Sequence, residues 1–152
     1  MSTIAMRQRP ERIMGLDIGG KRTGVAVADE LGISAGPVGF VMRGPRDRAE
    51  LRALIERYGI TRIVAGLPAN MSGREGPQAA DVRDYAERLA ADLDLPLDYW
   101  DERLTSTIAE RTLIDRGVRR EKRREQIDAV AAAVMLQNYL DAEANRRRRM
   151  GG

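Results

Sequence analysis

Three acidic residues stand where a carboxylate is costly or well placed for catalysis. Asp17 lies inside the apolar run 13–18, where an acid is expensive unless it is used or paired. Glu102 follows a second apolar segment, and Asp128 directly precedes the apolar run 129–136. If these acids converge, their oxygens could hold one or two Mg²⁺ or Mn²⁺ ions, which would polarise a phosphate and supply hydroxide.

Each acid also has a structural interpretation. A strand Asp such as Asp17 is often a hydrogen-bonded turn-former or an ion-pair partner. Glu102 could form a surface ion pair with Arg103, and Asp128 could complement the dipole of a helix start. Glu125 lies three residues before Asp128 and shares its helix face, which makes it a possible fourth ligand. A solvated acid within a basic run is the simpler interpretation of Glu125.

The composition removes several kinds of chemistry. The chain has 152 residues, which fits one compact domain, and it contains neither histidine nor cysteine. This excludes a histidine general base, a cysteine nucleophile, a Ser-His-Asp triad, a zinc site of His or Cys and any disulfide. Carboxylates, hydroxyls, Lys and Arg remain, and they suit hard metal ions with oxygen ligands.

The positive charge is concentrated at one end of the sequence. The 26 cations and 23 anions give a net charge of +3, but Arg146–Arg149 alone carry four of the positive charges. The rest of the chain is therefore slightly acidic, and the basic balance does not by itself make it a polyanion binder. A second basic stretch, 116–124, could follow phosphates, or it could be a solvated face.

Hydrophobic patterns predict an α/β protein with the order β-β-β-α-β-α-β-α-α. The expected strands are 13–18, 24–29, 37–42, 63–67 and 97–100. Four helices are expected. The first begins at a capping box of Asp47 with Glu50 and ends at Gly59, and the second runs from Pro77 to Leu93. The third runs from a capping box of Thr107 with Glu110 to Gly117, and the fourth runs from about Glu125 to Glu143. This order predicts a mixed five-stranded sheet with helices on both faces.

We expect a single domain at 13–143, a flexible N-terminal arm at 1–12 and a disordered basic tail at 144–152. No export signal is visible near the N-terminus, and the longest apolar run is too short to span a bilayer. The expected localisation is therefore cytoplasmic, with no membrane partner.

Two glycine-containing segments could contact phosphate. The segment 19–24 (GGKRTG) exposes backbone N–H groups, but it lacks the Walker spacing, and a tight hairpin turn explains it equally well. The segment 66–76 lies between a strand and a helix, where α/β proteins often bind ligands, although it could be an ordinary connection.

Four segments of the chain resemble motifs of the YqgF/RuvX family. They are DIGGKRTGVA from Asp17, GLPANMSGREG from Gly66, DERLTS from Asp101 and IDAVAA from Ile127, in the expected order over about 13–141. The family is described as Holliday junction resolvases and, more recently, as nucleases that mature pre-16S rRNA. The resemblance implies an RNase H-like fold, related to RuvC resolvase and more distantly to actin-like ATPases.

The resemblance also implies roles for particular residues. Asp17, Glu102 and Asp128 match the family's three acids, which makes them the expected catalytic residues and ligands of Mg²⁺ or Mn²⁺. The NMxGxEG loop is expected to line the substrate groove. The candidate nucleic-acid contacts are Lys21, Arg22, Asn70, Arg74, Arg103, Arg119, Arg120, Lys122, Arg123 and Arg124.

The expected function is metal-dependent endonuclease action on structured RNA, in maturation of the 5′ end of pre-16S rRNA. Two alternatives stay open: resolution of branched DNA junctions, which requires a dimer, and a non-catalytic RNase H-like module that binds RNA or ribosomal partners. The chain itself could be a monomer or a homodimer.

Overall fold

The computed structural model of the protein describes residues 11–68, 76–104 and 120–151, and side chains of the last segment from Ile127 onward. Nine elements follow one another in these ranges: β1 (Ile13–Ile18), β2 (Arg22–Ala28), β3 (Ala35–Met42), α2 (Asp47–Tyr58), β4 (Arg62–Leu67), α3 (Pro77–Leu93), β5 (Leu97–Asp101), the 3₁₀ turn η1 (Glu102–Leu104) and α5 (Arg120–Gly151). None of the helices in these ranges is long and apolar enough to cross a membrane.

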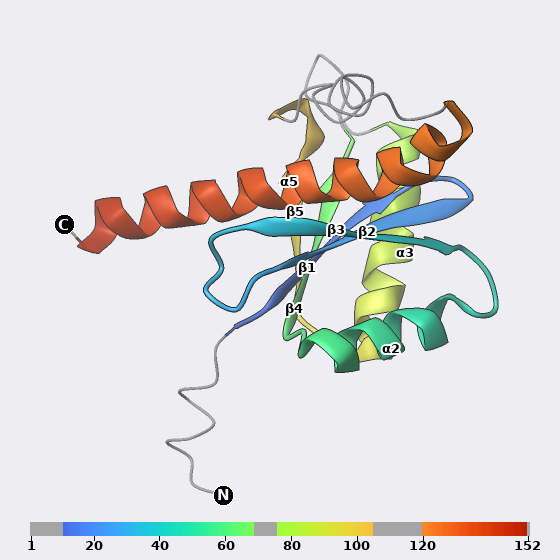
Figure 1. The fold of residues 1–152 in the computed structure, drawn as a ribbon, viewed down its shortest axis with the longest axis horizontal. Helices are drawn as coiled ribbons and strands as arrows, with labels where there is room; N and C mark the ends of the chain where they lie inside the picture. Colours follow the sequence, from blue (N-terminus) through green and yellow to red (C-terminus); the bar gives the residue numbers. More distant parts are fainter. Residues whose placement is uncertain (1–10, 69–75, 105–119, 152) are drawn as a thin grey trace, which may run out of the picture.

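The five strands form one mixed sheet in the order β3-β2-β1-β4-β5 (Figure 1). The first three strands are an antiparallel meander, whereas β4 lies parallel to β1 and β5 lies parallel to β4. The carboxyl ends of β1, β4 and β5 therefore meet at one edge of the sheet. The predicted mixed five-stranded sheet is confirmed.

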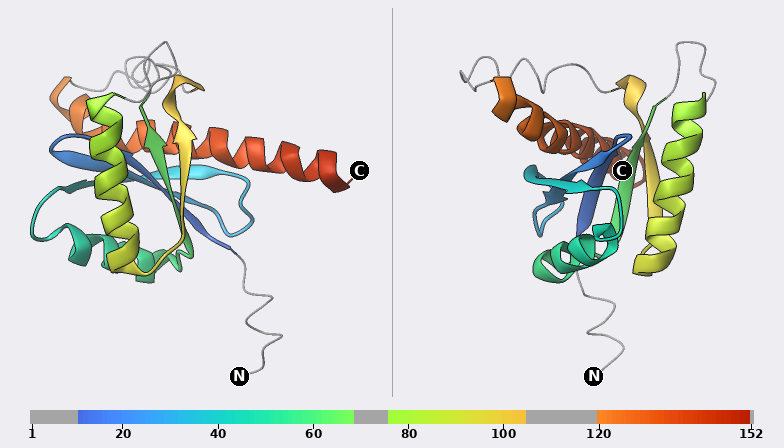
Figure 2. Two further views of the ribbon diagram at one scale, coloured as in Figure 1. Left: turned by 180° about the vertical axis from the view of Figure 1, so that it is seen from behind. Right: turned by 90° about the vertical axis from the view of Figure 1, so that its right-hand side faces the viewer.

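Helix α5 lies on one face of the sheet and α3 on the other (Figure 2), and the core is divided between these two faces. Met14, Leu16 and Ile18 point toward α2 and α3, in a core that includes buried residues of both helices. Ile13 packs with residues of α5 on the opposite face. Because strand side chains alternate with period two, Gly15 and Asp17 also face α5. A Cβ added at Gly15 would indeed meet the Leu136 side chain.

Helix α5 is longer than the sequence pattern predicts. The pattern ends the last helix at Glu143 and expects a disordered tail at 144–152, whereas α5 continues to Gly151. Arginine is a good helix former, and neither Gly nor Pro interrupts the chain before Gly151, so the helix continues beyond its last buried turn. The helix predicted over 107–117 lies outside the described residues.

Helix α2 begins differently from the predicted capping box. Its N-cap is Arg46, which makes no side-chain cap, and Asp47 is the first helical residue. The Asp47 carboxylate is buried and accepts hydrogen bonds from the backbone N–H groups of Gly44 and Arg48. The prediction that Gly59 ends this helix is confirmed, since Gly59 is its left-handed C-cap.

Candidate active site

The sheet topology brings two of the three acids to one edge. Asp17 is the penultimate residue of β1, and Glu102 follows β5 directly. Both strands run parallel to β4, so their carboxyl ends lie on the same side of the sheet. An open pocket of about 170 Å³ at this edge is lined by Asp17, Glu102 and two residues of α5, Ala131 and Met135.

The carboxyl groups of Asp17 and Glu102 share a hydrogen bond. Burial raises the pKa of Asp17, and the hydrogen bond to Glu102 partly offsets that rise. Burial, then the hydrogen bond and the charge of Asp17, raise the pKa of Glu102 to about 8. A hydrogen bond between two carboxyl groups requires a proton, so Glu102 donates to Asp17 at neutral pH. The pair thus carries one negative charge in place of two.

Asp128 comes from the covering helix α5 and is half-buried. The Nε atom of Arg22 lies 2.6 Å from its Oδ2 atom, an ion-pair contact that is not aligned as a hydrogen bond. Among the described residues, Oδ2 has no hydrogen-bond partner. Burial raises the pKa of Asp128, Arg22 opposes that rise, and the nearby charge of Asp17 adds to it. The negative charges of Asp17 and Asp128 therefore repel each other.

Two glycines from the segments 19–24 and 66–76 create the space for these acids, a role that the sequence analysis did not predict. A Cβ added at Gly24 of β2 would lie 1.8 Å from the backbone oxygen of Asp128. A Cβ added at Gly66 of β4 would lie 2.6 Å from the Oε1 atom of Glu102. Glycine inside a strand often marks such a close approach, and that was the available signal.

The acids fit a divalent cation, although they are not gathered as one ready-made ligand set. Within the described ranges, no three acidic side chains are placed to hold a metal ion together, and Asp128 is paired with Arg22. The Asp17–Glu102 pair, however, retains a proton where a cation could stand, and Oδ2 of Asp128 is held only by its ion pair with Arg22. An all-oxygen donor set of this kind suits Mg²⁺ or Mn²⁺.

Three predicted nucleic-acid contacts lie in well-described parts of the chain. Lys21 is exposed in the turn between β1 and β2. Arg22 is the first residue of β2, not part of the turn as predicted, and its side chain pairs with Asp128. Arg103 is exposed and forms an ion pair of 2.6 Å with Asp101, its neighbour in the DER motif.

The remaining candidates cannot be placed by their side chains. Asn70, Arg74 and Arg119 lie outside the described residues. Five others belong to the first turns of α5, of which only the backbone is described: Arg120, Lys122, Arg123, Arg124 and Glu125. Glu125 therefore remains a predicted fourth acid.

Comparisons with known proteins agree on one family. Residues 11–142 match the model of the family described as "RuvX: Holliday junction resolvase". The chain is 46% identical over 136 residues to a "Putative pre-16S rRNA nuclease" of Heliobacterium modesticaldum, covering 88% of this chain and 91% of the relative. It is 47% identical over 137 residues to the protein of the same name from Symbiobacterium thermophilum, covering 89% and 95%.

The fold resembles that of solved resolvases. The RuvC protein of T. thermophilus, in complex with a Holliday junction substrate, superposes with a TM-score of 0.54 at 15% identity over 89% of this chain and 96% of that chain. A second structure of Thermus thermophilus RuvC gives a TM-score of 0.52 at 12% identity over 88% and 96%. This likeness confirms the predicted RNase H-like fold.

Proposed function

This chain belongs to the RuvX family, and on that premise we propose that it is a metal-dependent endonuclease that matures the 5′ end of pre-16S rRNA. Its membership makes it a nuclease, a hydrolase that acts on nucleic acid. Metal dependence and the rRNA substrate are the proposed parts. The observation that carries the metal dependence is the desolvated, proton-sharing pair of Asp17 and Glu102, with Asp128 beside it.

We assign the metal-binding role to Asp17, Glu102 and Asp128, with Glu125 as a possible fourth ligand. A bound Mg²⁺ or Mn²⁺ would neutralise charge on the phosphate and lower the pKa of water at the site. A cation bound here would favour the ionised form of both Asp17 and Glu102, because metal ligands must be deprotonated. Asp17 lies near the end of β1, and Glu102 begins the 3₁₀ turn that directly follows β5.

The proposed phosphate contacts are Lys21 and Arg22, and Arg22 is paired with Asp128. Arg22 keeps about a third of its side chain exposed, and its neighbour Lys21 is exposed. Arg22 is thus placed to hold Asp128 in the free enzyme and a phosphate oxygen in the complex. The nuclease activity would reside in 13–143, and a precursor rRNA as substrate would place the protein in the cytoplasm.

The assignment to rRNA rests on the relatives named pre-16S rRNA nuclease. The test is cleavage of a pre-16S rRNA fragment that spans the 5′ end, in Mn²⁺ or in EDTA, by the wild type and by Asp17→Asn. Asp84→Asn is the matched control, because Asp84 is an exposed acid on α3. Cleavage that needs Mn²⁺ and Asp17, but not Asp84, supports the proposal. Equal cleavage by Asp17→Asn would contradict it.

Resolution of branched DNA is the second candidate, favoured by the family description and by the RuvC-like fold. Junction resolution needs two coordinated incisions and hence two active sites. Light scattering and a synthetic four-way junction separate the two candidates. A dimer that cuts the junction symmetrically would favour resolution, and a monomer that leaves it intact would exclude it.

A further inference from the structure

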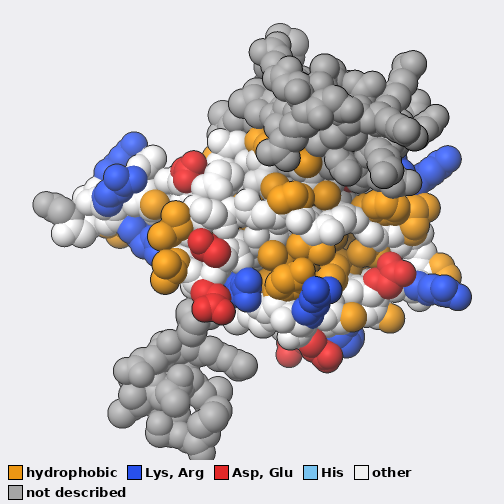
Figure 3. Space-filling model, in the orientation of Figure 1, with side chains coloured by type: hydrophobic (Ala, Val, Ile, Leu, Met, Phe, Trp, Pro, Cys, Tyr) orange, Lys and Arg blue, Asp and Glu red, His pale blue; other side chains and the backbone are white. Residues whose placement is uncertain are grey.

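The last turns of α5 leave the body of the protein. Leu140 is the last buried residue of the helix, and every residue from Asn145 to Gly151 is exposed. Figure 1 shows this end of α5 extending beyond the sheet, and Figure 3 shows Lys and Arg side chains gathered there. We call residues 145–151 the arginine end of α5.

The four arginines of the arginine end make only local contacts in the described structure. Arg146 pairs with Glu143, Arg147 donates to the backbone oxygen of Glu143, and Arg148 donates to the side chain of Asn145. Among the described residues, no ion pair joins these arginines to the sheet or to another helix. Exposed pairs within one helix contribute little stability, so the charges remain available to a ligand.

The arrangement of the charges selects the class of ligand. Successive helical residues point about 100° apart, so four consecutive arginines surround the helix on nearly all sides. A membrane-surface helix or a helix that docks in a groove needs one broad apolar face, and the only large apolar side chain of the arginine end is Met150. A collar of guanidinium groups instead suits the phosphates of a nucleic-acid backbone.

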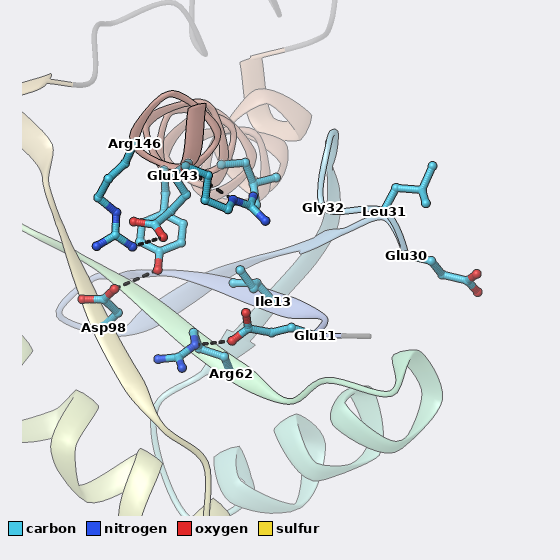
Figure 4. Close-up of a pocket in the computed structure, with 12 residues that line it drawn as sticks. Glu11, Ile13, Glu30, Leu31, Gly32, Arg62, Asp98, Glu143 and Arg146 are labelled. Carbon is cyan, nitrogen blue, oxygen red and sulfur yellow. Dashed lines mark hydrogen bonds and ion pairs between the residues drawn. The ribbon is translucent and has the colours of Figure 1, made fainter. Parts of the chain in front are cut away.

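A pocket beside the arginine end does not compete for this role (Figure 4). This pocket of about 490 Å³ includes three arginines in its lining. Arg62 already pairs with Glu11, and Arg146 pairs with Glu143. Four acids face these three arginines in the lining, so the pocket offers no net positive charge to an anion.

The continuous helix α5 sets the distance between the arginine end and Asp128. Arg146 follows Asp128 by 18 residues on the same helix, and at about 1.5 Å per residue this separates them by roughly 27 Å along the axis. Arg149 lies about 5 Å further. A duplex arm that extends from the cleaved bond for more than this distance has phosphates within reach of the long arginine side chains, whether the duplex is RNA or DNA.

We propose that the arginine end of α5 binds the phosphate backbone of a duplex arm of the substrate, roughly 27 to 32 Å from the cleaved phosphate. The inference rests on the proposed function, because it uses the acids to define the cleavage point. The proposal adds to the cleavage site a second contact with the substrate, at a distance set by the continuous helix α5. The residues predicted as a disordered tail are helical up to Gly151.

The first test measures binding without cleavage. All variants carry Asp17→Asn, and their affinity for a pre-16S rRNA fragment is measured from 50 to 300 mM KCl. Changing the four arginines 146–149 to Gln should lower the slope of log K against log salt by about 2 to 4, and changing them to Lys should preserve it. The charge-matched control changes four arginines of α2, its N-cap and α3 to Gln: Arg46, Arg52, Arg57 and Arg88. An equal loss of slope in that control would overturn the proposal.

The second test measures distance. Duplex arms of 5 and 15 base pairs, in RNA and in DNA, flank the same cleavage point. The Asp17→Asn protein should bind the longer arm at least about tenfold more tightly, and the Gln variant should lose most of that gain. Equal gains for both proteins would overturn the inference. Because binding is read without cleavage, a failure of the nuclease assignment would appear separately, in the Mn²⁺ cleavage assay.

Discussion

Gly24 lies directly opposite Asp17 in the antiparallel register of β1 and β2. The space that a Gly24 side chain would occupy is filled by the backbone oxygen of Asp128. Because Gly24 and Asp17 are paired across the two strands, this contact brings α5 down beside Asp17. The proximity of two acids therefore depends on a residue that has no side chain.

Replacing Gly24 with Ala should damage the site and the fold together. The new Cβ would lie 1.8 Å from the Asp128 oxygen, and the obstacle is backbone, which cannot rotate away. We expect a loss of about 1 to 3 kcal/mol in the free energy of unfolding, the usual range for overpacking. We also expect weaker Mn²⁺ binding, measured by calorimetry, because α5 must move away from β2.

Gly36→Ala is the matched control for that variant. Gly36 is also a strand glycine, in β3, but a Cβ there meets nothing within 4 Å. Its free energy of unfolding and Mn²⁺ affinity should stay near those of the wild type. If both alanine variants behave alike, the close approach at Gly24 is not what holds α5 in place.

Replacing Gly66 with Ala should affect function more than stability. The obstacle at 2.6 Å is Oε1 of Glu102, the end of a flexible side chain, which can rotate. The fold should therefore lose less than in Gly24→Ala. The displaced Glu102 should no longer pair with Asp17, so Mn²⁺-dependent cleavage should fall. Normal cleavage with an unchanged melting temperature would show that Glu102 need not lie over Gly66.

Much of the sheet could be predicted from the sequence because its cause is local. The alternation of side chains in β1 assigns Leu16 to one face and Asp17 to the other, and Gly59 has the freedom that a helix end requires. The placement of Glu102 followed from the parallel order of the strands. These features depend on periods of two and 3.6 residues, which are visible in one sequence.

The contact of Asp128 with Arg22 could not be predicted in the same way. It depends on how α5 crosses the sheet, and therefore on packing between segments that are far apart in the chain. A helix pattern indicates which side chains are buried but not the crossing angle. The sequence pattern places Asp47 in a capping box, whereas the side chain is buried and accepts a hydrogen bond from Tyr85 of α3. This contact also depends on packing between segments that are far apart in the chain.

Removing the cation at Arg22 should strengthen metal binding by the free protein. Arg22 lies 2.6 Å from Oδ2 of Asp128 and competes with a divalent ion for that carboxylate. We expect Arg22→Gln to bind Mn²⁺ more tightly by calorimetry but to bind RNA more weakly, because a phosphate contact is lost. Arg103→Gln is the control, since Arg103 pairs with Asp101 and not with the proposed ligands. Weaker Mn²⁺ binding by Arg22→Gln would show that Arg22 positions Asp128 for the ion.

The buried carboxylate of Asp47 should make the stability of the protein depend on acid pH. Burial alone raises the pKa of Asp47, but hydrogen bonds from Tyr85, from Arg48 and from the backbone of Gly44 and Arg48 outweigh it, so the pKa lies below its ordinary value. The hydroxyl of Tyr85 donates to Oδ2 at 2.6 Å. A carboxylate with a lowered pKa stabilises the fold fully above its unfolded pKa of about 3.9. That contribution is lost as the pH falls through the lower, folded value.

Asp47→Asn should therefore lose about 1 to 3 kcal/mol in the free energy of unfolding at pH 7, as expected for hydrogen bonds to a buried charge. The difference from the wild type should shrink in urea titrations as the pH falls below about 3.9, where the carboxyl of the unfolded chain begins to take up a proton that the folded carboxylate resists. Asp81→Asn is the control, because Asp81 also has a lowered pKa, through Arg43, but is exposed. A difference between wild type and Asp47→Asn that stays constant from pH 7 to pH 3 would mean that the side chain stabilises α2 by shape and not by charge.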